Sequence, residues 1–89
     1  MSDREVTPID AEVGRRIRLE RQKAEWSQSA LAERLGISFQ QVQKYELGKN
    51  RITIGRLIQI AMAFGTPLST FTDGLEELAG KLLKGKRRS

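Results

Sequence analysis

The 89-residue chain is long enough for one small domain, in which most Leu, Ile, Val and Phe residues must be buried. Its net charge of +5 favours polyanionic partners, but it also fits a merely soluble basic surface. Because the sequence has neither Cys nor His, it excludes disulfides, zinc fingers, Fe–S ligation and imidazole-based triads, and we expect no metal and no cofactor. No apolar run approaches the roughly 18–20 residues of a membrane span, and no signal peptide is seen, so we expect a cytoplasmic protein.

The N-terminal segment, residues 1–9, is mostly polar. With Pro8 as a helix breaker, it predicts a flexible arm. Asp10 can then cap a helix over residues 11–24. The apolar face of this helix contains Val13 and Ile17, which lie four residues apart.

Residues 27–48 have the pattern of a helix, a tight turn and a second helix. Ser27 and Ser38 are good N-caps for the two helices. Gly36 lies at the turn, where a left-handed backbone is cheap only for glycine. The expected helices span residues 28–35 and 39–47, with apolar positions at Leu31, Leu35, Ile37, Val42 and Tyr45. This pattern predicts a helix-turn-helix, whose second helix lies in the major groove of DNA.

Two more helices are predicted in the same domain. Thr53 can cap a helix over residues 54–64. Thr66 and Pro67 resemble the cap and the first-turn proline of a short fifth helix that ends at Phe71. The helix over 54–64 has apolar residues at the helical period, Leu57, Ile60, Ala61 and Phe64. We therefore expect the helix-turn-helix domain to span residues 10–73.

Residues 74–89 are expected to form a C-terminal helix followed by a basic tail. Leu75, Leu78 and Leu82 form one apolar stripe, although two glycines weaken the segment as a free-standing helix. The stripe is either a dimer interface or a surface that packs on its own domain.

The positions that carry a family resemblance lie in one register between Val13 and Phe71. They are Val13-Gly14, Ile17, Ser27-Gln28, Leu31-Ala32, Leu35-Gly36-Ile37, Val42, Tyr45-Glu46, Gly48, Leu57, Ile60-Ala61, Phe64-Gly65, Leu68 and Phe71. This stretch, about two thirds of the chain, resembles the lambda-repressor/Cro-type helix-turn-helix family, often called the XRE family. Glu20 departs from the family, which usually has an apolar residue there. Leu19 beside it either takes over that packing or is exposed.

The resemblance implies an all-α, five-helix DNA-binding domain, here with a possible short C-terminal helix. It also implies a sequence-specific transcriptional regulator, of the repressor kind, that binds double-stranded DNA as a homodimer on a palindromic operator. An enzyme is not expected. The candidate carboxylates, Glu76 and Glu77, are adjacent on a helix and point in different directions, and no nucleophile or metal ligand lies nearby.

Base readout requires forked donors and acceptors at the exposed start of the second helix of the motif. Gln40 and Gln41 qualify, since a glutamine amide can bond both N6 and N7 of adenine. The resemblance implies base contacts by Phe39, Gln40, Gln41 and Lys44. Phe39 would either contact a thymine methyl group or pack back against the preceding helix.

Phosphate contacts are implied at the two helix N-termini and in the loop after the second helix. The residues are Ser27, Gln28, Ser38, Gln43, Lys49, Asn50 and Arg51. Gln41 and Gln43 are also compatible with plain solvated surface. Arg21 and Glu46 align with a family ion pair that joins the first helix to the recognition helix.

A different class of function shares this DNA-binding core. In that alternative the chain is an antitoxin-like module that neutralises a partner protein and represses its own operon. The difference lies in residues 74–89, which would bind a foreign protein in the alternative and would associate with a second copy in the leading hypothesis.

Overall fold

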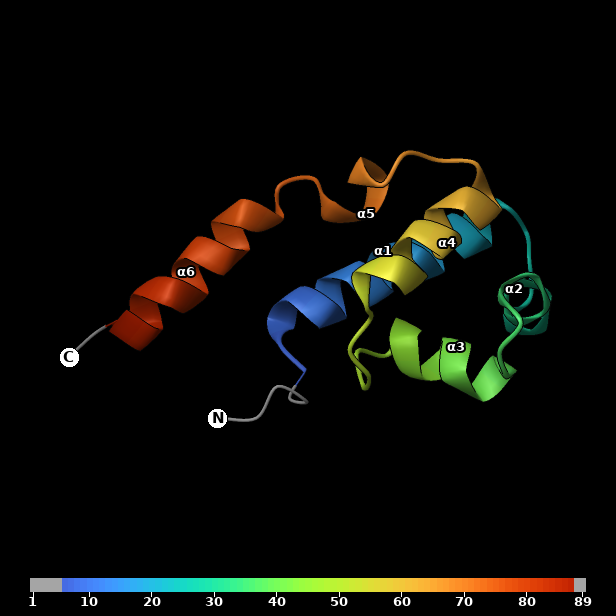
Figure 1. Ribbon diagram of the computed structural model, residues 1–89, viewed down its shortest axis with the longest axis horizontal. Helices are drawn as coiled ribbons and strands as arrows, with labels where there is room; N and C mark the ends of the chain where they lie inside the picture. The colour runs from blue at the N-terminus through green and yellow to red at the C-terminus, as the bar shows by residue number, and fades with distance from the viewer. Residues whose placement is uncertain (1–5, 88–89) are drawn as a thin grey trace.

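The computed structural model describes residues 6–87, which form six α-helices and no strand (Figure 1). Helices α1 to α5 surround one core, and α6 extends away from it. The all-α prediction, with five helices and a C-terminal helix, is confirmed. Most of the predicted arm over residues 1–9 lies outside the described residues, as do residues 88–89. The helices are α1 (Pro8–Lys23), α2 (Gln28–Leu35), α3 (Phe39–Glu46), α4 (Ile54–Phe64), α5 (Ser69–Thr72) and α6 (Leu75–Arg87).

The first helix begins at Pro8 rather than at Ala11, so the prediction that Asp10 is the N-cap is wrong. Thr7 caps α1. Its Oγ1 accepts hydrogen bonds from the N–H groups of Ile9 and Asp10, and the Asp10 carboxylate accepts the N–H of Thr7 at 2.8 Å. This reciprocal capping box stabilises an earlier start than Asp10 alone would give. Pro8 fits at the first helical position, where no N–H is needed, and it does not break the helix.

The core is built from the apolar faces of α1 to α5. Trp26, between α1 and α2, is half-buried and stacks on Phe64 with ring centroids 4.9 Å apart. Leu19 is 43% exposed, so it does not take over the packing that the family assigns to the position of Glu20. The fully packed members are Val13, Ile17, Leu31, Ala32, Val42, Leu57, Ile60, Ala61 and Phe71.

Helices α1 and α3 approach each other most closely at Gly14. A Cβ atom at this position would lie 2.0 Å from the backbone oxygen of Tyr45. Only a residue without a side chain therefore allows this distance between the two helices. The turn between α2 and α3 contains Gly36 in the predicted left-handed conformation, with φ of +71°. These two glycines set how the recognition helix lies against α1 and α2.

The start of α5 differs from the prediction, because Thr66 belongs to the end of α4. The Thr66 N–H donates to the carbonyl oxygen of Ala61 at 3.0 Å, and the N–H of Gly65 donates to Met62 at 3.1 Å. These two bonds close the left-handed end of α4. Thr66 therefore caps nothing, and its buried Oγ1 has no hydrogen-bond partner among the described residues. Helix α5 begins at Ser69 without a side-chain cap.

Helix α6 is longer than the two glycines suggested, with 13 residues. Leu75 packs against the core, and α6 lies against α1 near this point. Leu78 and Leu82 are half-buried, whereas Leu83 is 60% exposed. Contacts with its own domain therefore cover the Leu75 end of the predicted leucine stripe.

Candidate nucleic-acid interface

A short turn joins α2 to α3, and a serine caps the start of each helix. The Oγ of Ser27 accepts the N–H of Ala30 at 3.0 Å, and the Oγ of Ser38 accepts the N–H of Gln41 at 3.1 Å. A capping hydroxyl keeps its own hydrogen, which can still be donated to a DNA phosphate. Both serines are exposed. The caps thus position two hydroxyl donors at the starts of the two helices of the motif.

One face of α3 is buried and the other is open to solvent. Val42, Tyr45 and Glu46 face the protein interior. The open face carries the four predicted base contacts and one predicted phosphate contact: Phe39, Gln40, Gln43 and Lys44 are exposed, and Gln41 is half-buried. Phe39 is 45% exposed, so the fold covers only part of its side chain. The open face is therefore mainly an amide and ammonium surface with one aromatic edge.

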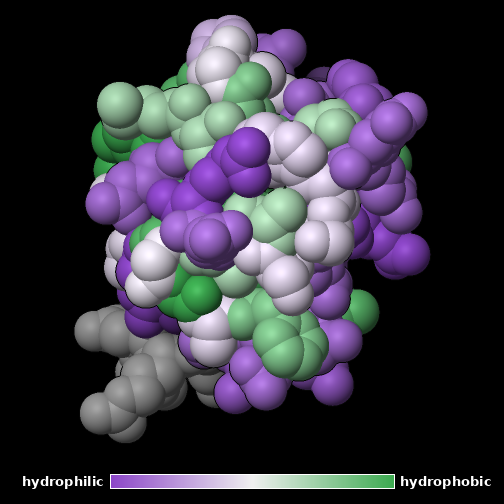
Figure 2. Space-filling view, turned by 90° about the vertical axis from the view of Figure 1, so that its right-hand side faces the viewer, coloured by the Kyte–Doolittle hydropathy of each residue, from purple (hydrophilic) through white to green (hydrophobic). Residues whose placement is uncertain are grey.

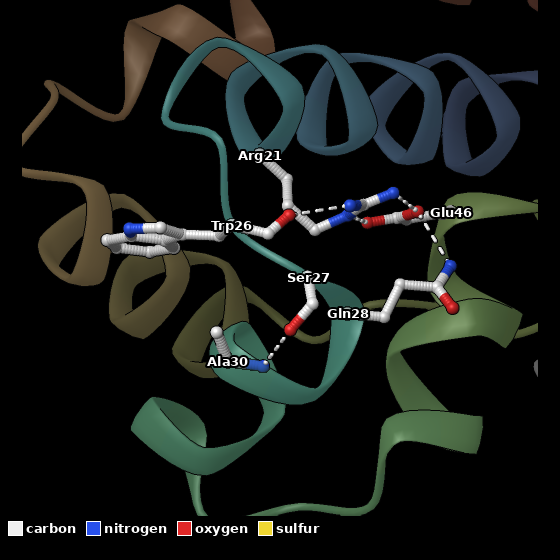
Figure 3. Close-up of polar contacts among 6 residues, drawn as sticks. All are labelled: Arg21, Trp26, Ser27, Gln28, Ala30 and Glu46. Atoms are coloured by element: carbon white, nitrogen blue, oxygen red, sulfur yellow. Dashed lines mark hydrogen bonds and ion pairs between the residues drawn. The ribbon is translucent and has the colours of Figure 1, made fainter.

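Arg21 and Glu46 form a two-pronged ion pair beneath this face (Figure 3). The Nε of Arg21 lies 2.7 Å from Oε2 of Glu46, and its second terminal nitrogen lies 3.1 Å from Oε1. The side chains are 13% and 2% exposed. A paired guanidinium and carboxylate of this geometry form strong, directional hydrogen bonds. The pair joins α1 to the end of α3.

Two more hydrogen bonds extend this pair into a network. The remaining terminal nitrogen of Arg21 donates to the carbonyl oxygen of Trp26 at 2.8 Å, and Nε2 of Gln28 donates to Oε1 of Glu46 at 3.1 Å (Figure 3). Sequence reasoning missed both contacts, because they join residues whose proximity arises only in the fold. The network therefore connects α1, α2 and α3, and it holds the Gln28 amide at the start of α2.

A polar hollow of about 220 Å³ opens beside the network. Two of its lining residues, Arg18 and Leu47, were not predicted from the sequence to contact DNA or to form the ion pair. The hollow is lined by Arg18, Arg21, Gln28, Gln43, Glu46 and Leu47. Because Gln28 and Gln43 share it, two predicted phosphate contacts lie close to each other although they belong to different helices.

The loop after α3 carries the other predicted phosphate contacts. Lys49 and Arg51 are exposed and Asn50 is half-buried. The N–H of Lys49 donates to the carbonyl oxygen of Lys44 at 2.9 Å, which ties the start of the loop to the recognition helix. The two cationic side chains are therefore displayed directly beyond the end of α3.

Part of the positive charge of α1 is neutralised within the helix. The Glu12 carboxylate accepts hydrogen bonds from Arg15 at 2.8 and 3.0 Å and from Arg16 at 2.8 Å. The hydrogen bond to Arg15, followed in effect by the one to Arg16, lowers the pKa of Glu12 from 4.5 to about 2. The hydrogen bond between Arg15 and Glu12 also raises the pKa of Arg15. Arg15 and Arg16 are thus less available for long-range attraction to DNA than their number suggests.

The described residues hold no cluster of three or more side chains suited to a metal ion. Within this part of the chain, no helix is long and apolar enough to cross a membrane.

A family model described as helix-turn-helix, HTH_3, matches residues 17–71, which is more than half of the chain. The chain belongs to this helix-turn-helix family. The match includes the whole motif over residues 27–48, the ion pair and the core of α4. The resemblance stated from the sequence is therefore confirmed. Membership places the chain among DNA-binding regulators and not among enzymes.

Two relatives of this helix-turn-helix protein come from bacteria. An uncharacterised transcriptional regulator in the ATPase CF(0) region of Rhodospirillum rubrum is 47% identical over 73 residues, which cover 82% of this chain and 68% of the relative. An uncharacterised HTH-type transcriptional regulator of Sinorhizobium medicae is 52% identical over 64 residues, or 72% of this chain and 46% of the relative. The chain thus spans between about half and two thirds of the length of these relatives.

Solved structures share the fold at lower identity. The restriction-modification controller protein C.AhdI from Aeromonas hydrophila matches with a TM-score of 0.69 and 22% identity, over 73% of this chain and 98% of that one. Hydroxypropylphosphonic acid epoxidase from S. wedmorenis matches with a TM-score of 0.66 and 24% identity, over 70% of this chain but only 33% of the enzyme. The fold therefore occurs in unrelated functional settings, and function depends on the residues of the site.

Proposed function

We propose that the chain is a sequence-specific transcriptional repressor that reads the major groove with α3. The observation that carries this proposal is the open face of α3, where Gln40 and Lys44 are exposed one turn apart. Such side chains match the donors and acceptors that base pairs present in the major groove. Gln41 and Phe39 complete the base-reading set, with the Phe39 ring against a thymine methyl group. The transcriptional regulators that are 47% and 52% identical support the same conclusion.

The phosphate contacts in this proposal flank the reading face. Helix N-termini suit phosphate oxygens because their backbone N–H groups are free and the helix dipole is positive there. A contact with the backbone positions the protein but carries no sequence information. The proposed residues are Ser27, Gln28, Ser38, Gln43, Lys49, Asn50 and Arg51.

The active form on DNA is proposed to be a homodimer on a palindromic operator. One α3 reads only a few base pairs, which is too little for useful selectivity. Two modules on successive major grooves would read half-sites about 10 bp apart. Occupancy of such a site is sufficient to repress, since a bound dimer excludes other proteins from the same DNA. A regulator that binds DNA in this way would be located in the cytoplasm, where bacterial DNA lies.

The contrast between base and phosphate contacts tests the proposal. Gln40→Ala should weaken binding to the best site far more than binding to random DNA, because a good bidentate contact contributes about 1–3 kcal/mol of discrimination. Arg51→Ala should weaken both about equally and reduce the salt slope by about one unit. The measurement is a salt titration of both variants on the duplex selected best from a genomic DNA pool and on a random duplex.

Equal loss on both duplexes for Gln40→Ala would remove Gln40 from the base-reading set, and Gln41 or Lys44 would take its place. An absence of any preference in the unmodified protein would overturn sequence-specific binding itself.

The antitoxin-like alternative depends on α6, since this helix extends from the body and exposes Leu83. In that function residues 74–89 bind a partner protein. Purification of the chain from its native host distinguishes the two: a stoichiometric foreign protein that is lost when Leu83 is replaced by Glu supports the alternative.

A further inference from the structure

Helix α4 carries a second apolar face besides the one that packs in the core. Ile54, Ile58 and Met62 follow one another at four-residue spacing, so they lie on one side of the helix. They are 68%, 42% and 74% exposed. We call these three residues the α4 stripe. A surface helix normally needs only one apolar face, so the stripe is in excess of what folding requires.

The size of the α4 stripe also sets it apart from scattered surface residues. The three side chains are exposed together on one helix, and a contiguous apolar patch on a monomer is often functional. A standard interface buries about 800 Å² per partner. The α4 stripe would be the centre of a smaller interface than this, which fits a modest, concentration-dependent dimer. At the α2 end of the molecule, Figure 2 shows apolar patches interspersed with hydrophilic side chains.

Charge favours a second copy of this chain as the occupant. In a twofold interface each residue faces the same surface of its partner, so a charged residue there tends to meet its like. Two chains of charge +5 repel each other and can associate closely only where charge is absent. Arg56 is the single charged residue of α4, and its guanidinium bonds to the carbonyl oxygen of Leu35 and the amide of Gln59 within its own domain.

A hollow lies at the Met62 end of the stripe. It has a volume of about 460 Å³, and its lining combines the apolar Leu35, Met62 and Ala63 with Gln59 and Arg34. The Arg34 guanidinium stacks on the Trp26 ring of its own domain, 4.0 Å from the ring centroid. The other end of the stripe carries Ile54, which protrudes with most of its surface exposed. An antiparallel pair of α4 helices brings the protruding end of each copy to the hollow of the other. A parallel pair would leave both hollows without an apolar side chain.

We propose that the α4 stripe is the interface between two copies of this chain. In the dimer the α4 helices run antiparallel, Ile58 lies at the twofold axis, and the partner's Ile54 enters the hollow beside Met62. This assignment refines the dimer of the proposed function, and it replaces the leucine stripe of α6, which is partly covered by its own domain.

The test measures the mass of the full 89-residue chain without DNA over a range of concentrations, by analytical ultracentrifugation. Ile58→Glu places two carboxylates at the twofold axis and should raise the dimer dissociation constant at least tenfold. Leu83→Glu is the matched control, since it makes the same change at an exposed apolar position of α6 and should leave the dissociation constant unchanged. Circular dichroism of each variant verifies that it is folded.

A second readout uses the absence of cysteine from the sequence. Ile58→Cys should form a disulfide-linked dimer under mild oxidation, because residues on a twofold axis approach their own copies, whereas Leu83→Cys should stay unlinked. A monomeric unmodified chain at all concentrations, or a dimer that Ile58→Glu does not weaken, would overturn the assignment. Because DNA is absent, these results are independent of whether α3 reads bases.

Discussion

At the residue scale, the ion pair of Arg21 and Glu46 has the largest expected energetic effect. The Glu46 side chain is almost completely buried, and its two oxygens accept bonds from Arg21 and Gln28. Removing one partner of such a pair leaves an uncompensated charge in a region shielded from water. The cost for a buried pair is about 3–5 kcal/mol.

We therefore expect Arg21→Ala and Glu46→Ala each to lower the free energy of unfolding substantially. The double variant should lose less than the sum of the two, because the second change removes no further interaction. Urea unfolding of the three variants and of the unmodified chain completes the cycle. Additive losses would show that the two side chains do not interact directly in solution.

Residues of the candidate interface differ in how far the sequence alone predicts them. Gln40 could be named because a cap at Ser38 suffices to place it on an open first turn, whereas Lys44, one turn later, was implied by the family resemblance. The hydrogen bond from Gln28 to Glu46 could not, since it joins positions 18 residues apart in sequence. Local patterns give the face on which a side chain lies, but they do not give its partner across the fold.

At the scale of the elements, the ends of a helix were predictable where only one residue could act as its cap. Helices α2 and α4 have the predicted bounds, because each starts after a capping hydroxyl and ends at a left-handed glycine. The start of α1 was mispredicted because Thr7 and Asp10 form a reciprocal cap. Thr66 was misassigned because backbone bonds at the end of α4 engage it first. Helix α6 extends through Gly80, since the contact of Leu75 with the core adds to its local propensity.

The approach of α1 to α3 gives a prediction about two glycines. Gly14→Ala should destabilise the protein by about 2–4 kcal/mol, because the new Cβ would collide with the backbone of Tyr45 and force the helices apart. Gly80→Ala should instead stabilise it by about 0.5–1 kcal/mol, since no atom lies within 4 Å of the new Cβ and alanine favours a helix.

Thermal unfolding of the two glycine variants provides the measurement, and each serves as the control for the other. A Gly14→Ala variant as stable as the unmodified chain would mean that the two helices can separate without cost. In that case the orientation of α3 would have to be set by the Arg21 network alone.

At the scale of the whole molecule, we expect the domain to fold without α6. It touches α1 near Leu75, while most of its length extends from the core (Figure 1). A chain that ends at Asp73 should remain folded with a lower melting temperature, and it should keep the preference for its best DNA site. If the α4 stripe is the interface, the shortened chain should also keep its dimer dissociation constant.

Calorimetry, the DNA titration and ultracentrifugation of the shortened chain separate these expectations. Loss of dimerisation with retained folding would return the interface to the leucine stripe of α6. Loss of folding would show that α6 is an integral part of the core.

The open face of α3 has a consequence for how such proteins diverge. Among the described residues, no hydrogen bond involves the side chains of Gln40, Gln43 or Lys44, whereas α3 is held by Val42, Tyr45 and Glu46 on its other side. Substitutions on the open face should therefore change operator preference without a loss of stability. After gene duplication, one copy could acquire a new set of target genes through two or three changes, while both copies keep the same scaffold.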